Sequence, residues 1–514
     1  MTGMQDHLKN WNKIFIFFLF SFCLYYMENG YFNTIIAKSY AYRIALMLYL
    51  IPALILCTSL LLTNRKITKK GNHQEDTRRE HRKDHSRDTR SDHRRTFLSS
   101  MDLTDGAVAF FTISSILSTL LSPSPFESFF GNVGWQVGLW SLLGGAAIYA
   151  LFRMAPVEAP FLIQVIGIFT LPLFLWAIAN GLGADPFFLH KELLSGQRYD
   201  YIACIGNINA FSGYLSLILP PMYAGLVFCE KDRLRLLLAP SAFLGTIALF
   251  YNNSDGGYLG VLSGLAALTG YALFLRQYKR ILSLLWLIAL AGSLSLILSR
   301  ILPFSIPLRG ISARLSEQYI PIVALGCCSL LLLLLRFCKK ESQRLPFFLY
   351  TGALAMAFLY AVIWFFRHFS PAFGNNRGYI WGYAVGIFRR LPALQKIFGV
   401  GPDRFGVYTS RCYGARMQKI WGNTVSNAHC EYLQYLVTTG ILGAMGYIAM
   451  LSAALKNSFY KKKTDPKVSL FIYGIIGYFA QALVNNPHNL LIPVFFLFLA
   501  TAENEGSASS SLQI

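Results

Sequence analysis

The sequence predicts an all-α fold, a polytopic integral membrane bundle of about fourteen transmembrane helices with one long external loop that contains amphipathic helices. Hydrophobic residues make up 54% of the chain and charged residues only 14%, whereas soluble proteins are about one quarter charged. Apolar runs recur along the whole chain, and many reach the roughly 17 residues that a helix needs to cross a hydrocarbon core of about 30 Å. The basic clusters between these runs also alternate in a way that fits a membrane topology.

The apolar runs define the expected spans, one after another along the chain. We expect them at residues 13–28, 41–63, 102–121, 133–152, 158–181, 203–229, 235–252, 257–275, 281–299, 318–337, 345–366, 430–455, 468–485 and 488–502. The first run lacks a convincing small-residue cleavage site, so we expect a signal anchor rather than a removed signal peptide.

The distribution of Lys and Arg gives the expected orientation. Basic clusters fall in alternate loops, at residues 65–95, 153, 231–235, 276–280, 339–344 and 456–467. The positive-inside rule places these loops and both termini in the cytoplasm, and the intervening loops outside the cytoplasmic membrane. The net charge of +21 is therefore explained by cytoplasmic loops, and we expect membrane lipids rather than nucleic acid as partners.

Composition also divides the chain into regions. We expect N-terminal transmembrane helices at 1–63, a charged disordered cytoplasmic loop at 64–97, transmembrane helices at 98–200, a functional core at 201–455 with its external loop at 367–429, C-terminal transmembrane helices at 456–502 and a disordered tail at 503–514. Residues 64–95 contain twelve Lys or Arg, six Asp or Glu and four His, a mixture that cannot bury a core. The nine cysteines are scattered without a CxxC spacing, so we expect no metal and no disulfide framework.

Two polar clusters stand at expected helix entrances on the external side. Asn207 and Asn209 open the sixth span, where asparagines either cap the helix or present amide donors to an anion. Asp255 follows the seventh span in the sequence Asn-Asn-Ser-Asp-Gly-Gly. An ordinary tight turn would explain this sequence, but a carboxylate at the membrane boundary is costly unless it is paired or solvated.

The long loop at 367–429 is the third polar region. The apolar and aromatic spacing of residues 379–388 predicts an amphipathic helix on the membrane surface. Arg377, Arg404 and Arg411 give the loop an external positive charge that suits an anionic substrate. The Gly-Val-Gly sequence at 399–401 lacks the strand that a nucleotide-binding loop requires, so we reject that interpretation.

His429 ends this loop and precedes the next apolar run. An imidazole at the water-facing mouth of a membrane helix can accept a proton near neutral pH, which makes His429 a candidate general base. The alternative is an interfacial histidine that only caps the helix. The sequence Asn-Pro-His-Asn at 486–489 could lie nearby on the same side, with His488 as a structural cap.

Taken in order, these clusters resemble the O-antigen ligase and polymerase superfamily of bacterial membrane glycosyltransferases. The shared features are the Asn-rich helix entrance at 206–211, a Ser-x-Gly-Gly sequence at 254–257, Arg-x-x-x-Trp at 377–381, Pro-x-x-x-x-x-x-Gly-x-Gly-Pro at 392–402 and Ala-His-x-x-Tyr-Leu before Gly-Ile-Leu-Gly at 428–443. The resemblance covers about residues 200–455.

The resemblance implies an inverting glycosyltransferase or ligase that uses neither metal nor cofactor. The implied donor is a polyprenyl-pyrophosphate-linked glycan, transferred at the outer face of the membrane to a hydroxyl of a glycan, lipid or protein during cell-surface polysaccharide assembly. It places His429 on the family's catalytic histidine and Arg377 on an arginine of the family's long loop, so both are expected to be catalytic. From the residues themselves we expect Asn207, Asn209 and Asp255 to bind substrate, with Arg404 or Arg411 in place of the arginine that is missing at Asp255. Ligases usually have arginine at the position of Asp255, so polymerase and ligase activities both stay open.

Two other classes of protein stay open on the residues alone. A transporter or flippase for polysaccharide or lipid would also have many spans, but it usually places ionisable groups at mid-membrane and often contains internal repeats. A catalytically inactive component of a glycan-assembly complex would account for the unusual Asp255.

Overall fold

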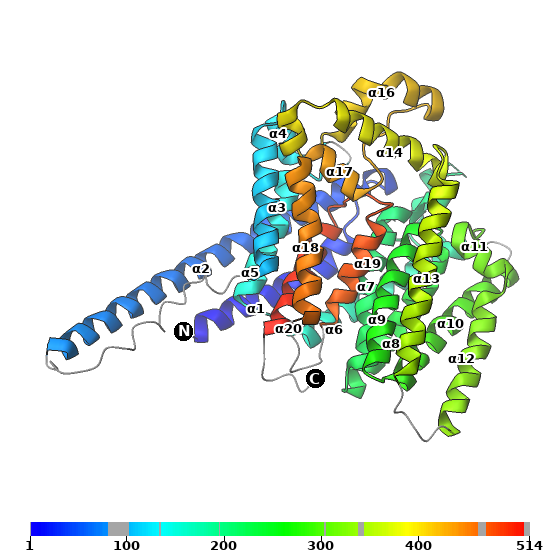
Figure 1. The fold of residues 1–514 in the computed structure, drawn as a ribbon, viewed down its shortest axis with the longest axis horizontal. Helices are drawn as coiled ribbons and strands as arrows, with labels where there is room; N and C mark the ends of the chain where they lie inside the picture. The colour runs from blue at the N-terminus through cyan, green and yellow to red at the C-terminus, as the bar shows by residue number, and fades with distance from the viewer. Residues whose placement is uncertain are drawn as a thin grey trace.

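A computed structural model shows a helical bundle (Figure 1). The short helices between residues 373 and 421 cover one end of this bundle, and we call them the cap. The structure describes residues 2–80, 102–132, 135–194, 196–302, 305–337, 344–460 and 469–507. The only strands in these ranges are β1 (Tyr201–Ile202) and β2 (Gly206–Asn207), which pair in antiparallel register as a short hairpin. The expected all-α fold is therefore confirmed for the described part of the chain.

Eight helical segments in the described ranges are long and apolar enough to cross a membrane. They are Tyr31–Ser59, which includes most of the apolar part of α2 (Thr34–Glu80), and α3 (Leu103–Leu120), α6 (Ala159–Gly181), α7 (Ile208–Phe228), α8 (Asp232–Tyr251), α9 (Asp255–Phe274), α10 (Tyr278–Ile301) and α13 (Leu345–His368). A ninth is formed if α11 (Gly310–Glu317) and α12 (Ile320–Phe337) act as one span, although they meet at a bend of 63°.

The remaining expected spans correspond to helices that are shorter or interrupted. These are α1 (Thr2–Phe18) with its π-helical continuation η1 (Leu19–Cys23), α5 (Leu139–Met154), α17 (Glu431–Thr438) followed by α18 (Gly440–Tyr460), α19 (Phe471–Gln481) and α20 (Leu491–Ser507). The described structure therefore supports a polytopic membrane protein with eight or nine qualifying spans.

The other short elements are the 3₁₀ turns η2 (Tyr31–Asn33), η4 (Leu189–Glu192) and η5 (Arg198–Asp200), and the helices α4 (Pro125–Phe130), α14 (Phe373–Arg390), α15 (Ala393–Phe398) and α16 (Phe405–Trp421). Helix α14 includes the amphipathic segment expected at 379–388 and begins six residues earlier. Its turn from 374 to 376 has positive φ at all three residues, so the chain bends sharply just before Arg377.

Helix α7 is the centre of the bundle, and 89% of its apolar window is buried inside the protein. It packs against α9, α19 and α8, and small residues allow the backbones to approach closely. A Cβ on Gly260 of α9 would collide with Ser216 of α7. Helix α13 is the opposite case, because none of its apolar window is buried, which suits a helix that faces lipid.

The cap has a small apolar core of its own, which lies beneath α14 and α16. Its buried residues are Ala384, Ile387, Leu391, Val400, Phe405, Ala428 and Val437. The Gly-Val-Gly sequence lies inside it, where the amides of Val400 and Gly401 donate to the carbonyls of Val437 and Thr438 at 3.2 and 2.9 Å. Gly401 has φ +107°, and a Cβ there would collide with Ser128, so close packing explains this glycine.

Two expectations about charged segments are only partly covered by the described residues. Helix α2 continues through Glu80, so the first part of the expected loop at 64–97 is helical, and residues 81–97 lie outside the described residues. Helix α20 continues to Ser507 rather than ending at residue 502. The carboxylate of Glu503, which we had assigned to the disordered tail, is buried and accepts hydrogen bonds from Thr104 and Asn457 at 2.7 and 2.9 Å.

Candidate functional site

His429 lies directly before α17, at the end of the bundle that the cap covers. Its φ is +47°, a left-handed conformation that is uncommon outside glycine and asparagine and that concentrates at functional sites. Its amide lies 3.4 Å from Asn427 Oδ1, and its carbonyl lies 3.4 Å from Trp381 Nε1 of α14. The next turn is fixed separately, because the amide of Glu431 donates to the carbonyl of Ala482 at 2.8 Å.

Arg377 lies close enough to His429 for its charge to act on the imidazole. Burial lowers the pKa of His429 to about 4, and the positive charge of Arg377 is the second cause. The imidazole is therefore neutral near pH 7 and has one ring nitrogen free to accept a proton. Both side chains are half-buried, so the proposed base and the cation share one partly desolvated environment.

The guanidinium of Arg377 has no hydrogen bond or ion pair with any other residue that the structure describes. Burial lowers its pKa, and the negative charge of Asp255 partly offsets this effect. Arginine stays charged under such conditions and presents five donors in a fixed fork. A half-buried cation with unused donors is suited to an anionic ligand.

The two asparagines at the start of α7 have different partners. Asn207 is the N-cap, and its side-chain oxygen accepts the Asn209 amide at 2.8 Å. The side-chain oxygen of Asn209 accepts the hydroxyl of Ser254 at 3.0 Å, and Ser254 is the N-cap residue of α9. The bond between Asn209 and Ser254 therefore joins the asparagine pair at the start of α7 to the polar segment before α9. The side-chain oxygen of Asn207 acts as an N-cap, as one of the two interpretations expected.

Asp255 is the first residue of α9 rather than part of a tight turn between helices. The turn precedes it at Asn253, which has φ +54° and whose side-chain oxygen accepts the Arg309 amide at 2.8 Å. The exposed carboxylate of Asp255 accepts the Ile311 amide at 2.8 Å. Asp255 thus connects α9 to the start of α11, and its charge also acts on Arg377.

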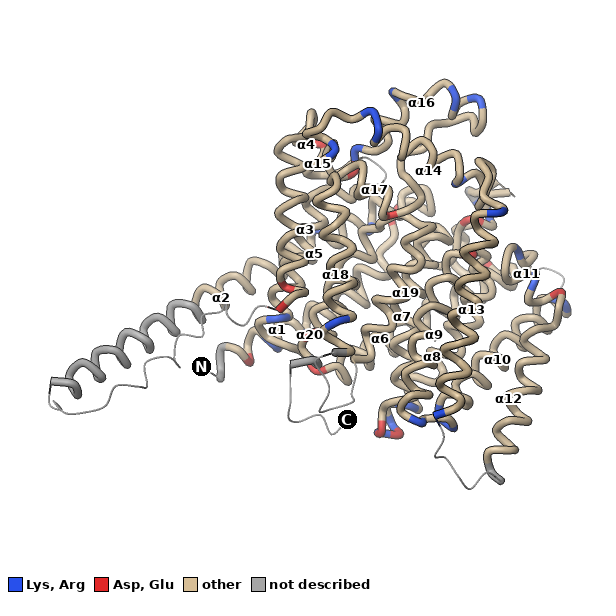
Figure 2. Tube along the Cα trace, in the orientation of Figure 1, with Lys and Arg blue, Asp and Glu red and all other residues tan. Residues whose placement is uncertain are grey.

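Arg404 and Arg411 belong to the cap. Arg404 precedes α16 and Arg411 is exposed on that helix, and within the described chain no hydrogen bond joins either of them to His429 or Arg377. Figure 2 shows basic residues along α14 and α16 at this end. Asp403 is the only acidic residue between 367 and 429 and is buried, so the exposed charge of the cap is positive.

Asp403 itself anchors the cap to the bundle. Its Oδ2 accepts the amides of Asn132 and Val137 at 2.6 and 3.2 Å, which lie in the segment between α4 and α5. Burial raises the pKa of Asp403 to about 7, although the two backbone hydrogen bonds and the charge of Arg404 act in the opposite direction.

Two neighbours of His429 were not assigned roles from the sequence. Asn486 lies between α19 and α20, and its side-chain nitrogen is 3.4 Å from His429 Nδ1. The ring of Trp381 is parallel to that of Phe369, with centroids 6.2 Å apart. The only signal for Asn486 in the sequence is its polar Asn-Asn-Pro-His-Asn context. His488 of that segment acts as a structural cap, because its Nδ1 accepts the Leu490 amide at 3.1 Å.

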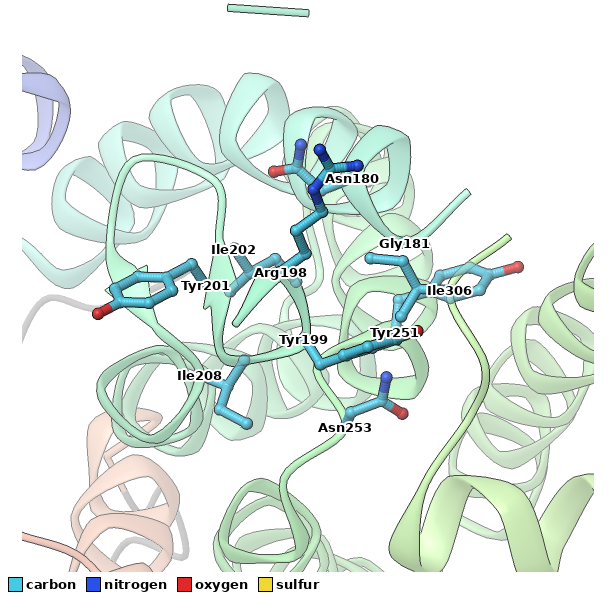
Figure 3. Close-up of a pocket in the computed structure, with 10 residues that line it drawn as sticks. All are labelled: Asn180, Gly181, Arg198, Tyr199, Tyr201, Ile202, Ile208, Tyr251, Asn253 and Ile306. Atoms are coloured by element: carbon cyan, nitrogen blue, oxygen red, sulfur yellow. The ribbon is translucent and has the colours of Figure 1, made fainter. Parts of the chain in front are cut away.

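A small cavity opens beside this region, between the end of α6, the hairpin, α7 and α8 (Figure 3). The cavity has a volume of about 220 Å³, part of which is open to solvent. Tyr199, Tyr251 and Asn253 are among its lining residues. The guanidinium of Arg309 lies 4.0 Å from the centre of the Tyr199 ring. Asn253 lines the cavity two residues before Asp255, so the cavity borders the polar end of α9.

Four parts of the chain meet at His429, namely α14, the entrance to α17, the loop between α19 and α20 and, through the charge on Arg377, the start of α9. We call His429, Arg377, Asp255, Asn209 and Asn486 the polar cluster. These residues provide an imidazole, a cation that has no hydrogen bond or ion pair in the described ranges, and amide side chains at one end of an apolar bundle. No family model matches the chain, and no curated protein matches it.

Proposed function

We propose that the protein is a membrane glycosyltransferase that moves a glycan from a polyprenyl-pyrophosphate-linked donor to an acceptor hydroxyl at the outer face of the cytoplasmic membrane. The observation that carries this proposal is the pairing of the imidazole of His429 with the guanidinium of Arg377, which has no hydrogen bond or ion pair among the described residues. A hydroxyl nucleophile needs a base and a pyrophosphate leaving group needs a cation, and Arg377 lies close enough for its charge to act on His429. The resemblance to O-antigen ligases and polymerases supports the same chemistry.

The proposed reaction uses His429 as the general base. As the acceptor oxygen attacks the anomeric carbon, its proton passes to the free ring nitrogen of His429. The bond between the anomeric carbon and the phosphate oxygen breaks, and its electron pair stays on the pyrophosphate. A single displacement of this kind inverts the configuration at the anomeric carbon, and a positioned base contributes about 10²–10⁴-fold to such a step.

Arg377 would stabilise the pyrophosphate as its negative charge grows. Its planar fork can donate two parallel hydrogen bonds to phosphate oxygens, and partial burial strengthens them relative to bulk water. The positive ends of α7 and α9 lie at the same end of the bundle and favour anions. Asn209, the half-buried Arg404 and the exposed Arg411 are proposed as further contacts for the donor or acceptor.

The proposed topology is the one that basic clusters predict, with fourteen spans, both termini in the cytoplasm and the cap outside. The helices that correspond to the expected spans support it, because short helices such as α19 lie in the interior against α7 and α9. Such a helix can cross the membrane among protein neighbours even where its own apolar stretch is short. An external cap would place the polar cluster on the side where lipid-linked glycans are assembled into surface polymers.

A transfer assay with the purified full-length protein in lipid nanodiscs tests this function. The donor is a polyprenyl-pyrophosphate oligosaccharide with a radiolabelled sugar, and the readout is label in a larger glycan product. We expect product with the wild type and none above background with His429→Ala. The matched control is His368→Ala, since His368 is exposed at the end of α13 and contacts only its own helix at Trp364 among described residues.

Three results would contradict the proposal. In sealed proteoliposomes, movement of the labelled lipid across the bilayer without transfer would favour a flippase, and binding without movement or transfer would favour an inactive assembly component. Product formation by His429→Ala at the wild-type rate would remove His429 as the base.

A further inference from the structure

Asn486 is the polar side chain that approaches the imidazole ring of His429, and its position identifies a role within the proposed reaction. The side-chain nitrogen of Asn486 lies 3.4 Å from His429 Nδ1. Such a separation is long for a hydrogen bond, but hydrogen bonds of a catalytic base commonly tighten only when substrate is bound. The contact leaves Nε2 as the ring nitrogen available to a substrate.

The other atom of the same amide group reveals how it is oriented. Asn486 Oδ1 is buried and has no hydrogen-bond partner among the described residues, a situation that costs free energy for a carbonyl oxygen. Rotation of the amide by 180° exchanges its oxygen and nitrogen within the same volume. The oxygen then faces His429 Nδ1 and accepts its hydrogen, while the nitrogen, which faces Nδ1 in the structure, takes the buried position that has no described partner.

The loop that carries Asn486 is held firmly on both sides. Asn485 donates to Gln481 Oε1 at 2.7 Å, and Asn489 donates to Ser39 Oγ and the Gln136 carbonyl at 2.7 and 2.8 Å. Pro487 restricts the backbone of Asn486 to extended conformations. The amide of Asn486 is therefore presented to the ring by a fixed backbone.

We propose that Asn486 sets the tautomer of His429 by accepting a hydrogen bond from Nδ1–H, which leaves the lone pair on Nε2 to take the proton of the acceptor hydroxyl. A neutral imidazole has only one N–H, so the partner at one nitrogen decides whether the other is a base. The opposite amide orientation would place the hydrogen on Nε2 and remove the base. This inference rests on the proposed function and makes Asn486 a positioning residue.

The charges around the ring explain why such a partner is needed. The proton taken from the acceptor converts His429 to an imidazolium beside Arg377, whose charge opposes it. Asp255 also acts on Arg377, but its carboxylate is already bonded to the Ile311 amide. The oxygen of Asn486 stabilises the imidazolium at Nδ1 without adding a charge that would repel the pyrophosphate.

Nitrogen NMR of the full-length protein in nanodiscs tests this assignment without any donor. The protein is labelled with ¹⁵N-histidine, and the His429 signals are identified by their absence in His429→Ala. We expect the wild type to carry the hydrogen on Nδ1 and Asn486→Ala to shift toward the Nε2–H form. Transfer by Asn486→Ala should fall by about 10²-fold, the lower range for loss of a positioned base.

A conservative variant and a control variant complete the test. Asn486→Asp keeps an acceptor at Nδ1, so it should keep the Nδ1–H tautomer and restore transfer relative to Asn486→Ala. Its negative charge should also move the acidic limb of the pH–rate profile to higher pH. Asn423→Ala removes an exposed amide of the same kind and should leave the His429 tautomer as in the wild type.

Two results would overturn the inference. One is an Nε2–H tautomer at His429 in the wild type, and the other is an unchanged tautomer and wild-type transfer in Asn486→Ala. The tautomer is measured without substrate, so a failure of the glycosyltransferase proposal appears separately, as absence of transfer by a wild type whose tautomer still depends on Asn486.

Discussion

The two ends of the bundle use charged residues in opposite ways. At the end away from the cap, the guanidinium of Arg153 donates four hydrogen bonds, to Asp102, Asp105 and Asn504, at distances between 2.8 and 3.2 Å. At the cap end, Arg377 is also half-buried but has no hydrogen bond or ion pair within the described chain. Two arginines of similar burial thus differ in their partners. Arg153 joins helices through its hydrogen bonds, whereas Arg377 keeps donors without a described partner, which suits an anionic substrate.

The same contrast extends to the acids and the imidazole. Glu503 is buried beside Thr104 and Asn457, and both of its oxygens are hydrogen-bonded. His429 has a long contact with Asn486 at one ring nitrogen and a positive neighbour that opposes its protonation. Complete hydrogen bonding makes a polar group structural, whereas incomplete hydrogen bonding at a helix entrance leaves it available for chemistry.

The largest expected effect is on catalysis at the cap end. Arg377→Ala should lower kcat/KM for transfer by the equivalent of about 2–5 kcal/mol, the usual loss for one buried charged hydrogen-bonding partner. Arg377→Lys should stay impaired, because a point charge cannot reproduce a bidentate fork. Thermal unfolding in detergent should be unchanged, since the guanidinium has no described partner. Full transfer by Arg377→Ala at normal expression would exclude it from the site.

The next effect should be on stability at the opposite end. Arg153→Met leaves Asp102 and Asp105 beside each other without their cation, and removal of one member of a buried pair costs on the order of 3 kcal/mol. We expect a lower thermal unfolding temperature, with the kcat/KM of the folded fraction near that of the wild type. Simultaneous Asp102→Asn and Asp105→Asn should recover part of the loss. If Arg153→Met unfolds like the wild type, the structural role of this network is wrong.

The pH dependence of transfer should reveal the protonation state of His429. Its pKa is lowered to about 4, so the neutral base is fully present at pH 7 and is lost only as the pH falls through about 4. An imidazolium that contacts pyrophosphate would show the reverse, with transfer lost as the pH rises through the same value. We therefore expect a rate that is constant from pH 8 to 6. An acidic limb near 6.5, the ordinary value for histidine, would contradict the buried position.

The smallest effect is expected at the joint between the cap and the bundle. The pKa of Asp403 is raised to about 7, so the folded form holds its proton more tightly than the unfolded chain does. Linkage then makes its contribution to stability greatest below its ordinary pKa and lost progressively as the pH rises through about 7. Hydrogen exchange at the Asn132 and Val137 amides should increase modestly from pH 5 to 8, after correction for intrinsic rates. The same correction should give a flat profile for Asp403→Asn.

The sequence predicted the helical class and several local features because these depend on nearby residues. Apolar run length predicted most of the helices, and the spacing at 379–388 predicted α14. The N-cap role of Asn207 is also a local feature, because its side chain bonds to the first turn of α7. The number of qualifying spans was harder to predict, because α5 and α19 are short and α17 stops at Thr438 before α18 begins. These helix lengths depend on neighbours in space rather than on the apolar run alone.

The candidate site was only partly predictable for the same reason. Its location before α17 follows from a histidine at the end of a polar loop, but its partners come from elsewhere in the chain. The hydrogen bond that the Arg309 amide donates to Asn253 joins residues 56 positions apart in the sequence, and Asn486 contacts His429 across 57 positions. No local pattern specifies such pairs. The turn expected in the Asn-Asn-Ser-Asp-Gly-Gly segment lies at residues 252–254, because Asp255 already begins α9 and accepts a hydrogen bond from the Ile311 amide.

The long-range hydrogen bonds of the cap also constrain when the polar cluster can form during synthesis. Ser122 donates to the Val400 carbonyl across 278 residues, and Ser118 donates to the Thr438 carbonyl across 320. The loop with Asn486 is anchored to Ser39, 450 residues before Asn489. A nascent chain that has inserted α2 and α3 therefore still lacks the partners of both helices. The polar cluster becomes complete only after α19 and α20 have joined the bundle, because His429 has no contact with Asn486 before that stage.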